Sequence, residues 1–228
     1  LAIKHGLSIE EVDKLTGTIA GRAKSATFRT ADVVGLDTLK SVSLTTYDKA
    51  KEDEERSIFK IPKILEQLIE SNRLGQKTKS GFYKKNEDKS LSSVDLISGE
   101  YSPLNKVLFD CFRIAKDQQS LSRKLISLCY GDDRGSKYFW EVTANTLIYS
   151  ANRVPNISND IVNIDNAMKW GFGWELGPFE TWDAIGIEKS ILKMKAEGKN
   201  VPSWISEMLK SGRNNFYKVK DGLKTYWC

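Results

Sequence analysis

Several features that mark common protein classes are missing from this sequence. Its 228 residues contain no apolar run of 18 residues, so a membrane-spanning helix is not expected. No secretory signal pattern stands at the start of the chain. No block of basic residues interleaved with aromatic residues indicates a nucleic-acid surface. We therefore expect a cytoplasmic protein that binds no nucleic acid and spans no membrane.

Cysteine and histidine are scarce. Cys111, Cys129 and Cys228 lie far apart and form no CxxC pair, so we predict buried reduced thiols rather than a disulfide framework or a zinc site. The only histidine, His5, has no carboxylate neighbour in a catalytic context and is interpreted as a surface residue. No Gly-x-Gly-x-x-Gly motif follows a predicted strand, so the sequence contains no recognisable NAD site.

Length and charge leave several classes open. The chain is long enough for one large or two modest domains, each with a real core. A formal net charge of +5 favours contact with an anionic ligand such as a CoA phosphate, although a solvated basic surface explains it more simply. The charge-dense residues 48–56 are interpreted as a solvated helix face with oppositely charged i,i+4 pairs.

The sequence contains an internal repeat. Four residues of one segment fall on four of a second at a constant offset of 151: Phe28, Thr30, Asp32 and Gly35 on Phe179, Thr181, Asp183 and Gly186. Residues 62–71 then match 202–211 at an offset of 140, so the second copy has a shorter middle. Both copies close on Phe-Tyr-Lys, at 82–84 and 216–218. The repeat predicts two copies of one module.

Each copy predicts the same order of helices. Ser8 and Glu11 form a capping box at the first helix of copy one, and Ser158 or Asn159 caps the matching helix of copy two. A short helix follows in each copy, and then a helix that opens with proline. The residues predicted to open or end these helices are Gly35, Pro62, Gly75, Gly186, Pro202 and Gly212.

The predicted fold is mainly α, with two tandem helical modules related by pseudo-two-fold symmetry, each ending in a short β-hairpin. The hairpins pair residues 82–85 with 91–95, and 216–219 with 224–227 around an Asp221-Gly222 turn. Long helices are predicted over 104–128 and 138–151. The modules are expected to span residues 1–100 and 101–228, with the first helix of the first module truncated.

Three motifs carry a family resemblance. Residues 165–186, Asp-Asn-Ala-Met-Lys-Trp-Gly-Phe-Gly-Trp-Glu-Leu-Gly-Pro-Phe-Glu-Thr-Trp-Asp-Ala-Ile-Gly, resemble the D-x-A-M-x-x-G-x-G-x-x-x-G-P-F-x-x-x-D-x-x-G signature of the 3-hydroxyacyl-CoA dehydrogenase C-terminal domain. Residues 16–38 look like the variant first copy of that domain found in multidomain bacterial and archaeal members. Residues 75–83, Gly-Gln-Lys-Thr-Lys-Ser-Gly-Phe-Tyr, resemble the family's closing G-x-K-x-x-x-G-F-Y motif. The resemblance covers nearly the whole chain.

The resemblance implies an enzyme of fatty-acid β-oxidation that transfers a hydride from 3-hydroxyacyl-CoA to NAD, giving 3-oxoacyl-CoA. In this family a preceding Rossmann domain binds NAD and carries the catalytic His–Glu pair, while the helical part closes the acyl cleft and supplies a dimer or pseudo-dimer contact. The implied partners are the acyl-CoA substrate, the chain's own N-terminal Rossmann domain and, in some relatives, a fused enoyl-CoA hydratase domain.

The start of the chain adds a further expectation. Residues 1–6 look like the last turn of a helix capped by Gly6, so we expect a fragment of a longer polypeptide. Such a fragment is expected to be inactive alone, with no catalytic residue, cofactor or metal site of its own.

The candidate substrate-cleft residues lie in the first loop of copy one: Arg22, Lys24, Ser25, Thr27 and Arg29. The cations offer charge for CoA phosphates. Ser25 and Thr27 can cap the following helix, whose N-terminus attracts anions. The structural alternative is that Ser25 or Thr27 only caps this helix and that Arg29 pairs with a carboxylate such as Asp32.

Other features also have two interpretations. Asp32 and Asp183 could form an acid/base site, but their recurrence favours a structural hydrogen bond. The aromatic group Trp170, Phe172, Trp174, Phe179 and Trp182 could line a ligand site, but core packing between helices, or burial against the other copy, is favoured. Three functions therefore compete: a dehydrogenase substrate and association module, a non-catalytic helical binding or scaffold module, and a self-sufficient enzyme that uses these carboxylates.

Overall fold

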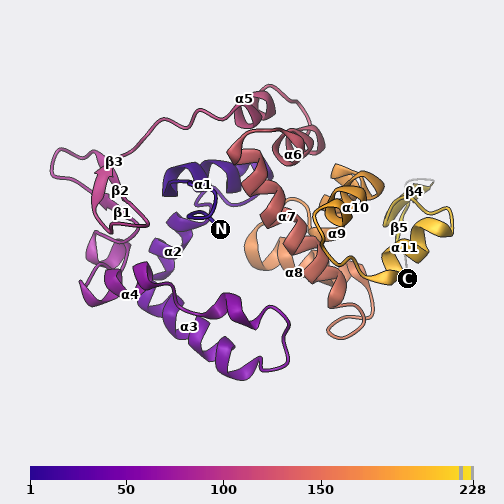
Figure 1. Ribbon diagram of the computed structural model, residues 1–228, viewed down its shortest axis with the longest axis horizontal. Helices are drawn as coiled ribbons and strands as arrows, with labels where there is room; N and C mark the ends of the chain where they lie inside the picture. Colours follow the sequence, from indigo (N-terminus) through magenta and orange to yellow (C-terminus); the bar gives the residue numbers. More distant parts are fainter. Residues whose placement is uncertain (221–222, 227–228) are drawn as a thin grey trace. The chain divides into compact units, whose positions relative to one another are not determined.

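The computed structural model describes residues 1–220 and 223–226, and it is mainly α-helical as predicted (Figure 1). The chain divides into two compact units. Unit 1 comprises Leu1–Gly17 and Lys24–Leu108, and unit 2 comprises Thr18–Ala23 and Phe109–Cys228. The segment Thr18–Ala23 therefore belongs to unit 2, although unit 1 residues flank it on both sides in the sequence. None of the described helices is long and apolar enough to cross a membrane.

The helices of unit 1 are α1 (Ile9–Thr16), α2 (Phe28–Val34), α3 (Leu36–Lys49) and α4 (Lys63–Glu70). The predicted capping box at α1 is confirmed: Ser8 Oγ accepts from the Glu11 N–H at 3.4 Å, and the Glu11 carboxylate accepts from the Ser8 N–H at 2.9 Å. Helix α3 was not predicted, because it buries only Leu36 and leaves Val42 exposed. Such a helix has no apolar stripe to reveal it.

Unit 1 also contains a three-stranded antiparallel sheet in the order β1 (Tyr83–Lys85), β2 (Leu91–Val94), β3 (Tyr101–Pro103). The predicted hairpin is confirmed in β1 and β2, which pair Tyr83 with Ser93. Strand β3, which pairs Tyr101 with Val94, was missed because it is short and has no alternating apolar pattern. The core of unit 1 lies between the helices and this sheet and consists of Ile9, Leu36, Ile64, Leu65, Leu68, Phe82 and Val94.

Helices dominate unit 2 as well. They are α5 (Asp110–Lys116), α6 (Leu121–Tyr130), α7 (Arg134–Asn152), α8 (Ile161–Phe172), α9 (Pro178–Ile185), α10 (Ile187–Ala196) and α11 (Ser203–Lys210). The single helix predicted over 104–128 is wrong. A break separates α5 from α6, where Ser120 accepts a hydrogen bond from the Arg123 N–H and opens a new helix. The second long helix is confirmed as α7.

The second predicted hairpin is confirmed as β4 (Tyr217–Lys220) paired with β5 (Leu223–Tyr226). Its predicted turn, Asp221-Gly222, lies outside the described residues. Helix α10 was not predicted; it follows directly after Gly186, where one helix ends and the next begins.

Several helix boundaries differ from prediction. Asp160 caps α8 in place of Ser158 or Asn159, because the Asp160 carboxylate accepts the Asn163 N–H at 2.8 Å. Pro62 and Pro202 occupy the cap positions before α4 and α11 rather than their first turns.

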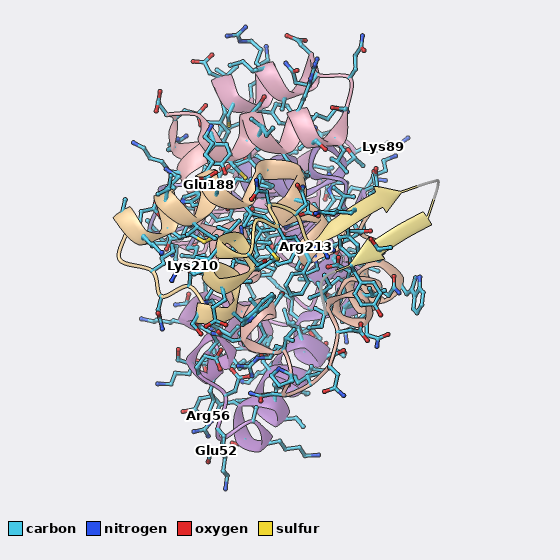
Figure 2. All side chains as sticks on the ribbon, turned by 90° about the vertical axis from the view of Figure 1, so that its right-hand side faces the viewer. Glu52, Arg56, Lys89, Glu188, Lys210 and Arg213 are labelled. Carbon is cyan, nitrogen blue, oxygen red and sulfur yellow. The ribbon has the colours of Figure 1, made fainter. Side chains whose placement is uncertain are left out.

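The ends of α4 and α3 also differ from prediction. Helix α4 ends at Glu70, not at Gly75, because Asn72 takes the left-handed conformation with φ 55°. Residues 48–56 do not form one helix face, since α3 ends at Lys49. Glu52 lies at the exposed end of this region (Figure 2).

Aromatic side chains fill the core of unit 2. The Phe216 ring centroid lies 5.0 Å from that of Phe179 and 5.5 Å from that of Trp182. Core packing is thus confirmed for Phe179 and Trp182, which are fully buried. It is wrong for Trp170 and Phe172, which are 81% and 64% exposed.

The thiols follow the prediction where they are described. Cys111 and Cys129 are free and buried, and burial raises the pKa of Cys129 to about 12. Such thiols are protonated and unreactive at neutral pH. Cys228 lies outside the described residues.

Candidate functional site

A half-buried carboxylate on α1, that of Asp13, organises unit 1. Asp13 Oδ1 accepts the backbone N–H groups of Thr27 at 3.0 Å and Phe28 at 2.7 Å. Asp13 Oδ2 accepts the Arg29 N–H at 3.1 Å and the Tyr83 hydroxyl at 2.9 Å. These bonds satisfy N–H groups that no helical carbonyl can reach, so Asp13 caps α2 from a distance. The bond to Tyr83 fixes β1 against the same helix end.

A second carboxylate, that of Asp32, binds the backbone at the start of strand β1. Asp32 of α2 accepts the N–H groups of Phe82 and Tyr83, each at 2.8 Å. Gly81 and Gly75 permit this contact, because a Cβ at Gly81 would collide with the Asp32 carboxylate and one at Gly75 with the Asp32 backbone. Asp32 therefore has the structural hydrogen bonds that the repeat favours.

Unit 2 contains the same arrangement. Asp165 of α8 accepts the N–H groups of Phe179 at 2.8 Å and Glu180 at 3.0 Å, and the Tyr217 hydroxyl at 2.7 Å. Asp183 of α9 accepts two backbone N–H groups, from Phe216 at 2.8 Å and from Tyr217 at 2.9 Å. We call Asp13, Asp32 and Tyr83, and likewise Asp165, Asp183 and Tyr217, the Asp–Tyr network of each unit.

Burial sets the ionisation of this network. Desolvation raises the pKa of Asp13 and of Asp32, and it raises the pKa of Asp165 to about 6. Their hydrogen-bond donors oppose that shift. All three carboxylates already accept two or more hydrogen bonds from the protein, so they are poorly placed to take a proton from a substrate.

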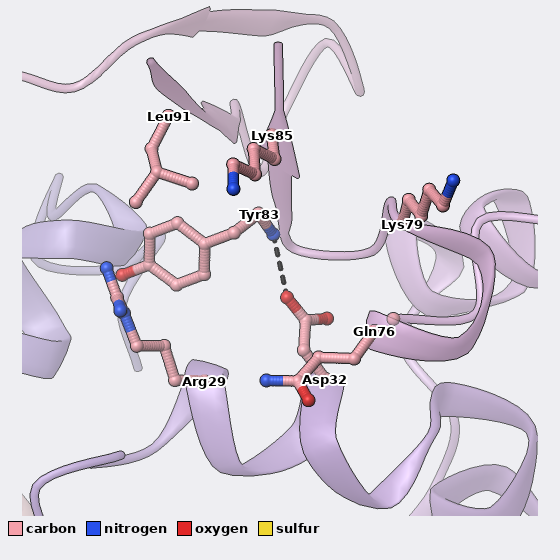
Figure 3. A pocket seen from close by; sticks show the side chains of 8 residues that line it. Arg29, Asp32, Gln76, Lys79, Tyr83, Lys85 and Leu91 are labelled. Atoms are coloured by element: carbon pink, nitrogen blue, oxygen red, sulfur yellow. Dashed lines mark hydrogen bonds between the residues drawn. The ribbon is translucent and has the colours of Figure 1, made fainter. Parts of the chain in front are cut away.

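One cavity of unit 1 adjoins the Asp–Tyr network (Figure 3). Its volume is about 290 Å³, near the lower end of the range of small-ligand sites. Its lining residues come from α2, the segment before β1, and the first two strands: Arg29, Asp32, Gly75, Gln76, Lys79, Tyr83, Lys85 and Leu91. We call this cavity the basic pocket, because three of these side chains are cationic and one is anionic.

The five predicted cleft residues do not belong to one unit. Arg22 belongs to unit 2, whereas Lys24, Ser25, Thr27 and Arg29 belong to unit 1. Of the five, Arg29 lines the basic pocket.

The predicted caps of α2 are wrong. Thr27 stands before α2 but makes no side-chain capping bond; its Oγ1 lies 2.8 Å from Thr16 Oγ1 instead. Ser25 Oγ accepts from the Thr30 hydroxyl at 2.8 Å. Asp13 is the group that satisfies the α2 N-terminus, and no local pattern could reveal it because it lies on the preceding helix.

Arg22 and Arg29 both lie over aromatic rings. The Arg22 guanidinium is 4.2 Å from the Trp174 ring centroid, and burial lowers its pKa to about 10. It therefore stays cationic at neutral pH. The Arg29 guanidinium is 4.9 Å from the Tyr83 ring centroid, so it is held by a cation–π contact.

Sequence reasoning missed Gln76, Lys79 and Lys85 as lining residues. The signal for Gln76 and Lys79 was the closing motif at 75–83, whose segment before Phe-Tyr is longer than its counterpart in the second copy. No cluster of three or more histidine, cysteine or carboxylate side chains able to hold a metal ion occurs in the described part of the chain.

Comparisons with known proteins assign part of the chain to a family. Residues 1–85 match the family model of the 3-hydroxyacyl-CoA dehydrogenase C-terminal domain. The chain therefore carries a 3-hydroxyacyl-CoA dehydrogenase C-terminal domain.

Individual relatives extend the match along the chain. A Bacillus subtilis protein named "Probable 3-hydroxyacyl-CoA dehydrogenase" is 44% identical over 225 residues, which are 99% of this chain and 28% of that relative. A Rickettsia prowazekii protein named as a fatty acid oxidation complex trifunctional enzyme is 29% identical over 88% of this chain and 27% of its own length. A Deinococcus radiodurans dehydrogenase relative is 44% identical over 85 residues, 37% of this chain and 24% of its own length.

Proposed function

We propose that this chain is the substrate-cleft and association part of an NAD-dependent 3-hydroxyacyl-CoA dehydrogenase. The intact enzyme would oxidise 3-hydroxyacyl-CoA to 3-oxoacyl-CoA in fatty-acid β-oxidation, passing a hydride from C3 to NAD and the hydroxyl proton to a general base. NAD and the catalytic groups would reside in an N-terminal Rossmann domain outside this chain. A fused enoyl-CoA hydratase domain is a further possible neighbour.

One observation carries this proposal: the 44% identity that runs along 99% of the chain but spans only 28% of the Bacillus relative. A match of that kind is what a helical portion of a larger dehydrogenase would give. The small antiparallel sheets of both units also differ from the parallel sheet on which a Rossmann domain binds dinucleotides.

The two-module organisation belongs to the same proposal. Residues 1–100 and 101–228 would be two copies of one module related by pseudo-two-fold symmetry. The recurrence of the Asp–Tyr network supports duplication, because both copies reproduce the carboxylates and the tyrosine with matching backbone partners. The second module would then be mainly structural.

The cleft candidates also remain part of the proposal. Arg22, Lys24, Ser25, Thr27 and Arg29 would lie along the acyl-CoA cleft of the intact enzyme. Their two exposed cations, Lys24 and Arg29, are available to a phosphate.

Calorimetric titration with acetoacetyl-CoA and with free CoA tests this function, together with NADH oxidation measured on the same protein. We expect weak, salt-sensitive binding and no NADH oxidation above buffer. Changing Arg22, Lys24 and Arg29 to alanine should reduce the affinity about tenfold or more, because charge-assisted contacts would be lost. A matched control changes three exposed cations of unit 2, Arg123, Lys195 and Lys210, to alanine.

Two results would contradict the proposed function, and each would point to a different alternative. NADH oxidation well above buffer would mean that the chain holds its own catalytic groups. No binding at millimolar acetoacetyl-CoA or CoA would favour a non-catalytic helical scaffold module. Equal losses in the test and control variants would indicate an effect of net charge alone.

A further inference from the structure

The basic pocket is unbalanced in charge. Arg29, Lys79 and Lys85 line it together with one anion, Asp32, which lies on the same helix as Arg29. The Asp32 carboxylate already accepts the N–H groups of Phe82 and Tyr83. The one carboxylate of the pocket lining is therefore held by the backbone and cannot rotate to form ion pairs with these cations.

The donors of the pocket are also unused. Among residues 1–220 and 223–226, no protein atom accepts a hydrogen bond from the side chains of Arg29, Gln76 or Lys85. Figure 3 shows the Arg29 guanidinium beside the Tyr83 ring, with the Lys85 side chain on the same wall of the cavity and the Gln76 amide below them. Lys79 points away from the Tyr83 ring, so it would attract an anion by its charge and not by direct contact. Unused donors around a cavity suit an anionic ligand.

Unit 2 shows that the fold does not need this lining. At the position of Arg29 it has Glu180, whose carboxylate accepts the Gly177 N–H at 3.0 Å and pairs with Lys169 at 3.0 Å. Glu180 therefore takes part in the capping box of α9, whereas the Arg29 guanidinium lies over the Tyr83 ring.

The segment before the Phe-Tyr pair differs in the same sense. Asn72 and Gly212 both end their helices in the left-handed conformation, with φ 55° and 81°. Ten positions then lead from Asn72 to Phe82, whereas four lead from Gly212 to Phe216. The longer segment of unit 1 supplies Gln76 and Lys79 to the pocket. Since the same Asp–Tyr network forms without them, these side chains are available for a ligand.

We propose that the basic pocket binds the phosphate monoester of the CoA part of the substrate. Arg29 would donate its planar fork to two phosphate oxygens, Lys85 would add charge and Gln76 a neutral donor. A phosphate monoester concentrates up to two negative charges on one phosphate group, whereas each phosphate of the pyrophosphate carries one. Two to three cations around one small cavity therefore match the monoester better. Tyr83 and Leu91 provide an apolar wall for the attached nucleoside. This assignment rests on the proposed function, since CoA is the ligand of that enzyme.

The test compares CoA with dephospho-CoA, which lacks only the monoester. Both are titrated calorimetrically at low salt into the wild-type chain and into the Arg29→Ala/Lys85→Ala double variant. We expect the wild type to bind CoA about tenfold more tightly than dephospho-CoA, because charge-assisted hydrogen bonds contribute on that scale. The double variant should bind both ligands equally, at the level of dephospho-CoA.

Two controls keep the outcome interpretable. The Arg123→Ala/Lys195→Ala variant removes the same net charge from exposed positions of unit 2 and should keep the preference. Arg29→Lys should keep part of it, since charge survives and the fork is lost. Melting curves check that the variants are folded, which is expected because Arg29 and Lys85 are exposed.

A preference for CoA that survives in the double variant would overturn the pocket assignment and leave the proposed function standing. A wild type that binds both ligands equally would overturn it as well. A wild type that binds neither ligand would reject the proposed function together with the pocket.

Discussion

Units 1 and 2 share a hydrogen-bonded network but differ beside it. In both, an aspartate of one helix, α1 or α8, accepts a backbone N–H at the start of the next helix and a tyrosine hydroxyl, through Asp13 and Tyr83 or Asp165 and Tyr217. Only unit 1 adds a longer segment before the Phe-Tyr pair and places Arg29 where unit 2 has Glu180. The shared part joins a helix to a strand in each unit, and the part that differs is where we propose that a ligand binds.

The comparison also bears on the acid/base hypothesis. A catalytic carboxylate would be expected in one unit and altered in the other, yet Asp32 and Asp183 each accept the same two backbone N–H groups. Asp32 also borders the basic pocket. Their equivalence indicates that both hold a strand to a helix.

The largest effect is expected at the glycine that lies against Asp165. A Cβ at Gly177 would collide with the Asp165 backbone and side chain. Gly177→Ala should therefore lower the free energy of unfolding by about 3 kcal/mol or more, through overpacking and a broken buried carboxylate contact. Gly171→Ala is the control: nothing lies within 4 Å of its Cβ, and it stands inside helix α8. That change should be neutral or stabilise by up to about 1 kcal/mol. Urea unfolding measures both, and equal effects would refute the close contact.

The next largest effect tests the equivalence of the two units. Asp32→Asn and Asp183→Asn should each cost about 2–3 kcal/mol, because the amide turns a donor toward one of the two backbone N–H groups and leaves it unsatisfied. Chemical denaturation of both variants, with CoA titration alongside, is the measurement. If Asp32→Asn keeps its stability but loses CoA binding, Asp32 is a ligand-binding residue. Asp32 and Asp183 would then have different roles in the two units.

A smaller effect concerns pH. Asp165 has a folded-state pKa of about 6 against an ordinary value of 3.8, so the folded protein holds this proton more tightly than the unfolded chain. Its contribution to stability is therefore fully present below about pH 4, is lost as pH rises to about 6, and is constant above that, amounting to up to roughly 3 kcal/mol.

Denaturation of the wild type and of Asp165→Asn between pH 4 and pH 7 tests this direction. The stability difference between the two should change across that window and level off above it. Asp110→Asn, at a side chain that is 78% exposed, is the control and should show no such trend. A constant difference between wild type and Asp165→Asn would show that Asp165 does not titrate there.

Local chemistry made much of the fold predictable. The Ser8–Glu11 box, the glycines that end α2 and α9, and both hairpins follow from neighbouring residues, whose preferences act over a few positions. The recurrence of Asp32 as Asp183 was visible as a constant offset. Helix α3 was not predictable in the same way, since burial of one residue leaves no periodic pattern.

The basic pocket could not be predicted, because its lining depends on contacts distant in sequence. Asp13 bonds both to the α2 N-terminus, next to Arg29, and to Tyr83, two residues before Lys85, and so joins the two segments that carry these cations. A sequence scan could notice that the segment from Gly75 to Gly81 is long and basic, but not that it faces α2. The five-residue loop hypothesis was likewise built on sequence proximity, and the fold divides those residues between two units.

The excursion of Thr18–Ala23 into unit 2 limits how this protein could be rearranged by recombination. The Gly21 carbonyl accepts the Glu175 N–H at 2.8 Å, so this short stretch is fastened within unit 2. Any single crossover in the gene between the units would give one product lacking that stretch and another carrying it without its surroundings. A product of such a crossover would therefore lack part of the residues that make up one of the two units.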